Sequence, residues 1–392
     1  MTTTKATRRT RSTDRRRQLI DAATVLFAER GYPHVSVTDI ARRAGVSAPT
    51  VYRHFADKQA LLLAAVQTRV DELEESTAGA DLASSDHPAD ALAASVTELS
   101  ISNPHATSLW RWSGQHLSAD ENADVVRRTR AVLRQWASAI RADRPELTER
   151  ESMYLAGAVL SVVGSGAGRA VRSGAHEMEE MVLALVRQTI RLTPSHAVPL
   201  RQTAGPGDDA PTRRDEILDA AARLFAENGF AGTGMDEIGA AVGITGPSVY
   251  KHFPSKLAIL VGISQRSAMR LEAGVMAAYA ITPDPAGRLN ALVDHYVDAV
   301  TSSPDLLVGF VSSYVLAGEP QAAELLAVQR RYVARWVQLL TDIDADRPPG
   351  SAVLAVHAAL AIVNDAVRLP RSTPRPEFAA RMAYLMKGVM GV

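Results

Sequence analysis

Apolar residues recur with helical spacing near the start of the chain and again about 200 residues later. Within residues 19–27 they fall at i, i+3, i+4, i+7 and i+8, and residues 217–225 repeat that spacing. This pattern predicts a helix with one buried face in each stretch. Gly31 and Gly229 follow the last turns, where a left-handed cap favours glycine.

A short second helix is predicted next. Ser36 stands three residues before Asp39, the spacing of a capping box, whereas the second stretch has Gly234, a weaker cap, three residues before Glu237. Gly45 then provides a turn. In each half of the chain, the sequence therefore predicts three helices, with a tight turn between the second and the third.

The third helix is expected over Ala48–His54, capped by Ser47, and over Gly246–His252 in the second stretch. Pro is tolerated in the first turn because those N–H groups have no helical partner. Val51 and Phe55 would face the core, which leaves Thr50, Tyr52, Arg53 and His54 outward. This arrangement is a helix-turn-helix, whose last helix can enter the DNA major groove.

An internal repeat covers the whole chain. Residues 15–62 align with residues 213–260 at a constant offset of 198, without gaps, and about 20 of the 48 positions are identical. Weaker similarity continues, with Trp110 answered by Phe310 and Trp136 by Trp336. Each half is thus a module of about 190 residues. The predicted divisions are a basic arm 1–14, a helix-turn-helix 15–62, a helical bundle 63–192, a linker 193–212, a second helix-turn-helix 213–260 and a second bundle 261–392.

Composition and charge narrow the possible functions. The chain has no Cys, which excludes disulfides and thiolate zinc sites and fits a reducing cytoplasm. Its zero net charge hides an asymmetry, since residues 1–62 hold about 12 Lys or Arg against 5 acids, and residues 200–262 about 6 against 8. The first region is therefore the basic patch expected of a phosphate-binding surface.

The signature LFAERGY…TDIARRAGVSAPTVYRHFADKQALL, repeated as LFAENGF…DEIGAAVGITGPSVYKHFPSKLAIL, resembles the TetR/AcrR family of transcription regulators. The resemblance implies an all-α fold in which each module has three DNA-binding helices followed by a helical ligand-binding and dimerisation bundle. It also implies operator DNA and a small-molecule effector as partners. The implied function is a ligand-responsive regulator, most simply a repressor that a small molecule releases from its operator.

Matching the family motif position by position assigns DNA-binding roles in both modules. In the first, it assigns phosphate contacts to Thr50, Tyr52, His54 and Lys58, base-facing positions to Ala48, Pro49 and Arg53, and a further groove contact to Thr38. In the second, the equivalents are Ser248, Tyr250, His252 and Lys256, followed by Gly246, Pro247 and Lys251. The chain has only five lysines, and two, Lys58 and Lys256, share one repeat position, where an ammonium beside a helix N-terminus could clamp a phosphate. Survival from the duplication would also explain the pair.

The second head is expected to bind DNA more weakly than the first. Asp236 replaces Thr38, and Ala240 and Ala241 replace two arginines. The alternative is that the second head has lost DNA binding and serves dimerisation or protein interaction. The basic arm could contact phosphates or the minor groove, or it could be a solvated, disordered tail.

Two assemblies are open. The modules could form an intramolecular pseudo-dimer with its heads about one DNA turn apart, or two chains could pair to give four heads. The pseudo-dimer is favoured. The apolar helices expected over Tyr154–Ala170 and Ala352–Val367 would form the interface, with Gly157, Gly164, Gly166 and Gly168 permitting close approach.

Effector pockets are expected in the two bundles. Candidate lining residues, for each of which plain core packing is the competing interpretation, are Trp110, Trp112, His116 and Tyr154, and then Phe310, Tyr314, His357 and Asn364. No catalytic motif or metal-ligand spacing was found, so no enzymatic activity, cofactor or metal is expected. With no membrane span or secretory signal, a cytoplasmic, nucleoid-associated protein is expected.

Overall fold

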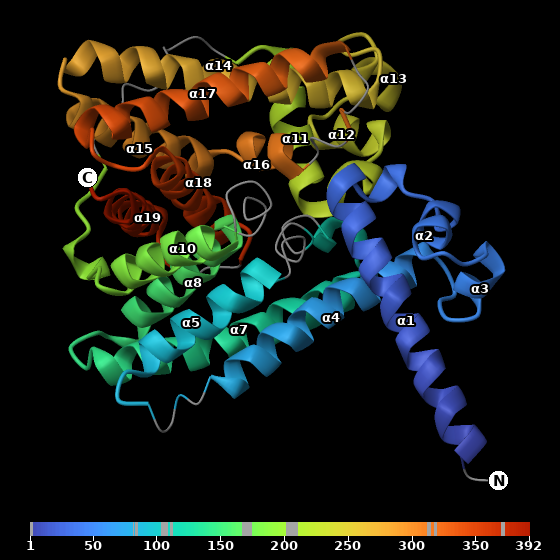
Figure 1. Ribbon diagram of the computed structural model, residues 1–392. Coiled ribbons are helices and arrows are strands. Elements are labelled where there is room, and N and C mark those ends of the chain that lie inside the picture. The colour runs from blue at the N-terminus through green and yellow to red at the C-terminus, as the bar shows by residue number, and fades with distance from the viewer. Residues whose placement is uncertain are drawn as a thin grey trace.

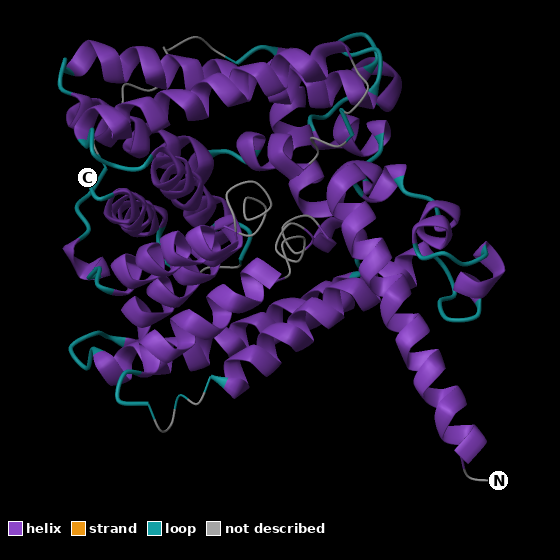
Figure 2. Cartoon of the chain, viewed as in Figure 1, coloured by secondary structure: helices purple, strands orange, loops and turns teal. Residues whose placement is uncertain are grey.

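The computed structural model describes residues 3–80, 82, 85–102, 109, 113–166, 175–200, 211–311, 315–316, 320–369 and 373–392. Within these ranges every regular element is a helix and there is no strand (Figure 2). The prediction of an all-α fold is therefore confirmed. None of the described helices has the length and apolar character needed to cross a membrane.

The two modules repeat one order of helices (Figure 1). The first contains α1 (Thr3–Arg30), η1 (Tyr32–His34), α2 (Val37–Arg43), α3 (Ala48–Tyr52), α4 (Lys58–Gly79), α5 (Pro88–Ser102), η2 (Gly114–His116), α7 (Ala119–Asp143), α8 (Glu149–Gly166) and α10 (Ala175–Ile190). After η4 (Pro194–His196), the second contains α11 (Arg213–Gly232), α12 (Met235–Ala241), α13 (Gly246–Val249), α14 (Lys256–Ile281), α15 (Pro285–Ser302), α16 (Asp305–Val311), α17 (Pro320–Ile343), α18 (Pro349–Ala366) and α19 (Arg375–Met390).

The first helix is longer than predicted. It begins at Thr3, so the segment expected as a separate basic arm continues α1 as helix and projects from the body (Figure 1). Residues 3–18 contain no Gly or Pro, which removes the strongest helix breakers from this segment. The contact of this basic segment with phosphates or the minor groove stays a prediction.

Each helix-turn-helix has its own core. In the first, Leu19, Phe27, Ile40, Val51 and Phe55 belong to one buried cluster. In the second, the corresponding residues 217, 225, 238, 249 and 253 form the equivalent cluster. These clusters confirm the inward positions that the helical spacing predicted. Burial of these residues is favourable because it removes one apolar face of each helix from water.

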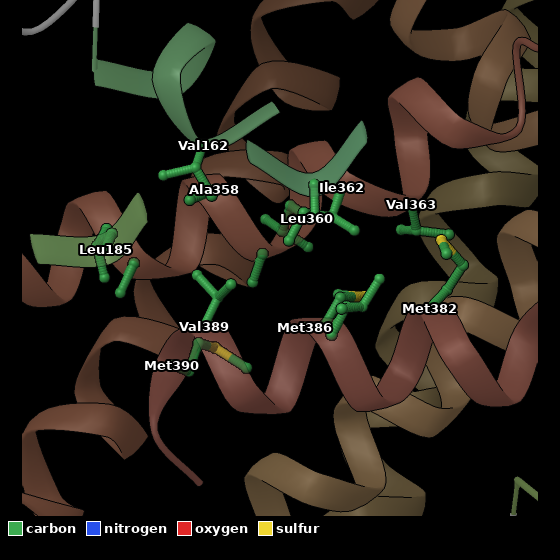
Figure 3. Packing of buried hydrophobic residues seen from close by; sticks show 14 of the residues in the cluster. Val162, Leu185, Ala358, Leu360, Ile362, Val363, Met382, Met386, Val389 and Met390 are labelled. Carbon is green, nitrogen blue, oxygen red and sulfur yellow. The ribbon is translucent and has the colours of Figure 1, made fainter. Parts of the chain in front are cut away.

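A bundle of α8, α10, α18 and α19 joins the modules. Val162 of α8 and Leu185 of α10 belong to the same buried cluster as Ala358 of α18 and Val389 of α19 (Figure 3). Polar contacts cross the same boundary, as where the Gln188 side-chain amide donates to the carbonyl of Gly388 at 2.6 Å. The two bundles consequently share one continuous hydrophobic core.

Two glycines of α8, Gly157 and Gly166, act differently from the prediction. A Cβ on Gly166 would lie 2.3 Å from Val182 of α10, so this glycine allows close packing inside the first module rather than between modules. A Cβ on Gly157 would have no atom within 4 Å, so that glycine borders open space. Gly168 lies outside the described residues.

Candidate DNA-binding heads and effector cavities

The third helix of each head presents an exposed tyrosine. Tyr52 is 56% exposed and Tyr250 is 53% exposed, although both rings are large. Both helices are shorter than predicted, because α3 ends at Tyr52 and α13 ends at Val249. Arg53 and Lys251 follow in the turns and are exposed. The outward face predicted from the pattern therefore exists in both heads, carried partly by a turn.

The remaining positions assigned to DNA lie around those tyrosines. Exposed residues at these positions are Thr38, Pro49 and Pro247. Half-buried residues are Ala48, Thr50, His54, Ser248 and His252, whereas Gly246 is buried. The structure thus leaves most of the predicted DNA surface open to solvent, and the contacts with DNA remain predictions.

Local capping orients the second and third helices. In α2, the Ser36 hydroxyl accepts from the Asp39 N–H at 3.1 Å and the Asp39 carboxylate accepts from the Ser36 N–H at 3.0 Å, which confirms the capping box. In α12, only the Glu237 carboxylate can reciprocate, accepting from the Gly234 N–H at 3.3 Å. Ser47 differs from the prediction, because its hydroxyl bonds the Thr50 hydroxyl at 3.0 Å and not a backbone N–H.

The carboxylate of Asp236 sits at the start of the second head's third helix. A Cβ built on Gly246 would lie 1.8 Å from its Oδ1 atom. The first head has Thr38 and Ala48 at these two positions. The pair Asp236 and Gly246 is therefore sterically coupled, and it puts an acidic group where a phosphate-binding surface would favour a neutral or basic one.

The two aligned lysines have partners within their own heads. The Lys58 ammonium donates to the Tyr32 carbonyl at 2.9 Å and lies 4.2 Å from the centre of the Tyr32 ring. The Lys256 ammonium donates to the carbonyls of Phe230 at 2.7 Å and Thr233 at 2.8 Å. Partial burial lowers the pKa of both lysines. Each lysine thus ties the fourth helix to the loop before the second, and its predicted phosphate contact stays a prediction.

His116 lies at the junction between the first head and its bundle. Its ring centre is 4.6 Å from that of Tyr32, and burial, followed by the charge of Lys58, lowers its pKa to about 4. Its segment η2 also contacts α11 of the second head. His116 was predicted to line an effector pocket, but it lines none of the three cavities described below.

The other predicted effector residues are dispersed. Trp110, Trp112 and Tyr314 lie outside the described residues, as does the side chain of Phe310. Asn364 bonds the buried Tyr296 hydroxyl at 2.9 Å, which favours its core-packing interpretation. His357 is half-buried on α18 and borders none of the three cavities. Tyr154 borders a cavity, although not one inside a single module.

The cavities in the described part of the bundles include two small ones and a larger one. One of about 90 Å³ lies among α4, α5, α7 and α8, and one of about 80 Å³ among α14, α16 and α17. A cavity of about 680 Å³ lies between the modules, bordered by α7 and α8 on one side and by α18 and α19 on the other. Sequence reasoning missed Thr129 and Asp365, which border both this cavity and the one of about 90 Å³, because no local pattern marks a surface shared by distant helices.

Comparisons with known proteins agree with the helix-turn-helix geometry. Residues 19–65 and 217–263 each match the family model described as bacterial regulatory proteins, tetR family. Over 165 residues, covering 42% of this chain and 74% of that protein, the chain is 32% identical to the HTH-type transcriptional activator FasR of Mycolicibacterium smegmatis. Over 188 residues, covering 47% of this chain and 93% of that protein, it is 29% identical to the HTH-type transcriptional regulator BetI of Cronobacter sakazakii.

A solved structure of a TetR-family transcriptional regulator from Bordetella parapertussis also aligns with the chain. It is 22% identical, with a TM-score of 0.40, and covers 45% of this chain and 95% of that chain. All three proteins thus match less than half of this chain while being covered over most of their own length.

Proposed function

Since the chain belongs to the tetR family of bacterial regulatory proteins and carries two copies of its DNA-binding domain, we propose that a single chain binds one operator with both heads. In this proposal residues 15–62 and 213–260 are the heads, and the two bundles are halves of a pseudo-dimer. A bound small molecule changes the bundles and releases the DNA. The chain then acts as a ligand-responsive transcription regulator.

The shared core of α8, α10, α18 and α19 carries the pseudo-dimer proposal. Each module buries its last two helices against those of the other, as Val162 and Met386 illustrate (Figure 3). A second chain that used the same helices would have to displace this apolar contact, which is costly because each buried side chain contributes about 1.5–3 kcal/mol. Because the heads differ, the operator should be an imperfect palindrome.

Three measurements test this proposal. Mass determination at micromolar concentration should give a particle near 42.0 kDa, and DNA titration should give one chain per operator. A free particle of twice that mass would overturn the pseudo-dimer. A genome-wide footprint should then show sites with two unequal half-sites separated by about one helical turn.

The direction of regulation is proposed as repression. Bound DNA released by a ligand is the simplest way for a regulator of this architecture to respond to an effector. The names of the relatives include both directions of regulation, since FasR is named an activator and KstR of Mycobacterium tuberculosis is named a repressor. Transcription from the promoter of the gene that encodes this chain should rise when the gene is deleted. A fall would show that the chain activates transcription, and the proposal that it binds DNA would still stand.

A second candidate function applies to the second head alone. Asp236 at the third helix, together with Ala240 and Ala241 in place of Arg42 and Arg43, favours a head that serves protein contact instead of DNA. Footprints covering one half-site only, with unchanged salt dependence after Lys251→Ala, would support this alternative. Two protected half-sites would support the proposal that both heads of one chain bind the operator.

A further inference from the structure

We infer that the cavity between the modules is a binding site for an amphipathic organic anion, which bridges both halves of the chain. The site adjoins the cavity of about 90 Å³, with which it shares Thr129 and Asp365, and is separate from the cavity of about 80 Å³ in the second module. Its volume, about 680 Å³, lies within the range of about 300–1,000 Å³ common for small-molecule pockets. The other two, at about 80 and 90 Å³, offer room for only a few heavy atoms.

The interior of the cavity suits an apolar ligand body. Leu133 and Ala158 come from the first module, and Ile362, Phe378 and Met382 from the second. These five are at most 3% exposed, so their surfaces form a dry wall rather than a solvent-facing rim. Open space at Gly157 continues the cavity along α8. An apolar group placed here would lose its contact with water on both sides.

The polar groups of the cavity suit an anionic end. Arg130 and Arg134 lie one turn apart on α7 and both border it, as does Arg150 of α8, 3.7 Å from Glu377. The bordering carboxylates are exposed Glu149 and buried Asp365, and Glu377 pairs with Arg150, so the cationic part of the lining that we assign to the anion is Arg130 and Arg134 of α7. A guanidinium binds carboxylate, sulfonate or phosphate through charge-assisted hydrogen bonds.

A buried hydroxyl provides an independent sign of a missing partner. Thr129 is 2% exposed and its Oγ1 atom has no hydrogen-bond partner, although it borders the cavity. A buried polar atom without a partner costs free energy, and a ligand that drew this covered hydroxyl toward the cavity would remove that cost. Thr129 precedes Arg130 on α7, so one helix turn offers both a hydroxyl and a guanidinium.

Because of its location, ligand binding in this cavity depends on how the two modules are placed relative to each other. Because both modules build its walls, an occupant is bound only when α7 and α8 face α18 and α19. Helix α7 begins just after η2, whose His116 contacts Tyr32 of the first head. Binding can therefore be transmitted to a head along α7. This last step rests on the proposed function, whereas binding itself does not.

The test uses the full chain and two fluorescent probes that share an anilinonaphthalene skeleton. 8-Anilinonaphthalene-1-sulfonate carries an anion, and N-phenyl-1-naphthylamine lacks it. We expect one sulfonate probe to bind per chain, about tenfold more tightly than the neutral probe. Equal affinities for the two probes would overturn the anion assignment.

Two variants place the probe in the cavity. Arg134→Gln should weaken the sulfonate probe about fivefold and leave the neutral probe unchanged, whereas Arg141→Gln, exposed on the same helix and outside the cavity, should change neither. Gly157→Leu should fill the open space and weaken both probes at least tenfold. Its control is Gly79→Leu, which also adds a side chain into open space on a helix. Unchanged binding in Gly157→Leu would place the probe elsewhere and overturn the site.

The consequence for DNA is measured separately. Saturating sulfonate probe should release operator DNA from the wild-type chain and not from Gly157→Leu. Binding in the cavity without release would support the site and contradict its regulatory role. If the chain does not bind operator DNA in the absence of probe, the proposed function is contradicted, whereas the results on probe binding still hold.

Discussion

The two heads share their interior and differ on their outer surface. In both, an arginine of the first helix lies over the last core aromatic, Arg16 at 5.1 Å from the centre of Phe55 and Arg214 at 3.9 Å from that of Phe253. Both also use the lysine at the start of the fourth helix to bond the loop before the second. Divergence after duplication has therefore spared the contacts that hold the third helix.

The differences gather on the surfaces expected to meet other molecules. Asp236 replaces Thr38 beside the third helix, and its carboxylate occupies the space that a Cβ at position 246 would take. The junction with the bundle is an exception in the interior, where Phe230 replaces Tyr32, and buried Leu316, aligned through the pair Trp110 and Phe310, replaces His116. A packed interior restricts substitution, whereas an exposed surface can change its charge without altering the fold.

The largest effect is expected from removing the outward groups of the first head. Tyr52→Ala with Arg53→Ala should weaken operator binding roughly a hundredfold, since each lost DNA contact costs about 1–3 kcal/mol. Tyr250→Ala with Lys251→Ala should weaken it less than about tenfold. All four side chains are exposed, so stability should be unchanged. Titration by fluorescence anisotropy at several salt concentrations measures both. A greater loss in the second pair would reverse the ranking of the heads.

A tenfold change is expected from exchanging the acidic position. Asp236→Thr should strengthen binding about fivefold to tenfold and steepen its salt dependence, because it removes an anion from the phosphate-binding surface. The reciprocal Thr38→Asp, made with Ala48→Gly to leave room for the carboxylate, should weaken binding by a similar factor. If neither change moves the salt dependence, the acid does not face DNA.

A smaller effect is expected from the pH dependence of His116. Burial lowers the pKa of His116 from 6.5 to about 4, so the folded state binds its proton less tightly than the unfolded chain. Its neutral form is the stable one, and stability is retained above pH 6.5 and lost as pH falls from 6.5 toward 4. Between pH 7 and pH 5 the wild type should lose about 1 kcal/mol more than His116→Leu, after allowance for partial exposure.

Urea unfolding at the two pH values measures that difference. Leu is the residue that the second module carries at the corresponding position, so the variant makes the two junctions alike. Because the carboxylates are common to both proteins, their titration cancels. If the stability of wild type and variant depends on pH in the same way, His116 binds its proton equally well in the folded and the unfolded state.

The smallest effect is expected at Gly246. Gly246→Ala should destabilise the second head by under about 1 kcal/mol, because the new methyl group meets the Asp236 carboxylate, which can swing away at modest cost. Combining it with Asp236→Thr should restore the loss, since the first head combines Ala48 with Thr38. Thermal unfolding of the single and double variants forms the cycle. Additive losses would show that the two positions are not coupled.

Local chemistry allowed much of the heads to be predicted. The helical spacing of residues 19–27, the capping box at Ser36 and the burial of Val51 and Phe55 all agree with the structure. Each depends on residues within a few positions, where periodicity and hydrogen-bonding rules act directly. The exposed Tyr52 follows from the same periodicity, since a helix with one buried face turns its other residues to solvent.

Contacts between distant segments were outside the reach of such rules. Periodicity cannot show that the Lys58 ammonium turns to the Tyr32 carbonyl, or that the His116 ring lies against the Tyr32 ring. The length of α3 was also overestimated, because Arg53 and His54 lie in a turn after its end at Tyr52.

The amino-acid sequence by itself determined two helix-turn-helix modules, their helical bundles and the outward side chains of their third helices, because short-range spacing encodes each of them. The packing of α8 against α18 was expected from their apolar sequences, but only the tertiary structure decided that α10 and α19 complete this interface, that Tyr154 borders a cavity between modules and that Asp236 rests against Gly246. These features require surfaces far apart in the chain to fit one another, and shape complementarity across a core is a property of the whole fold.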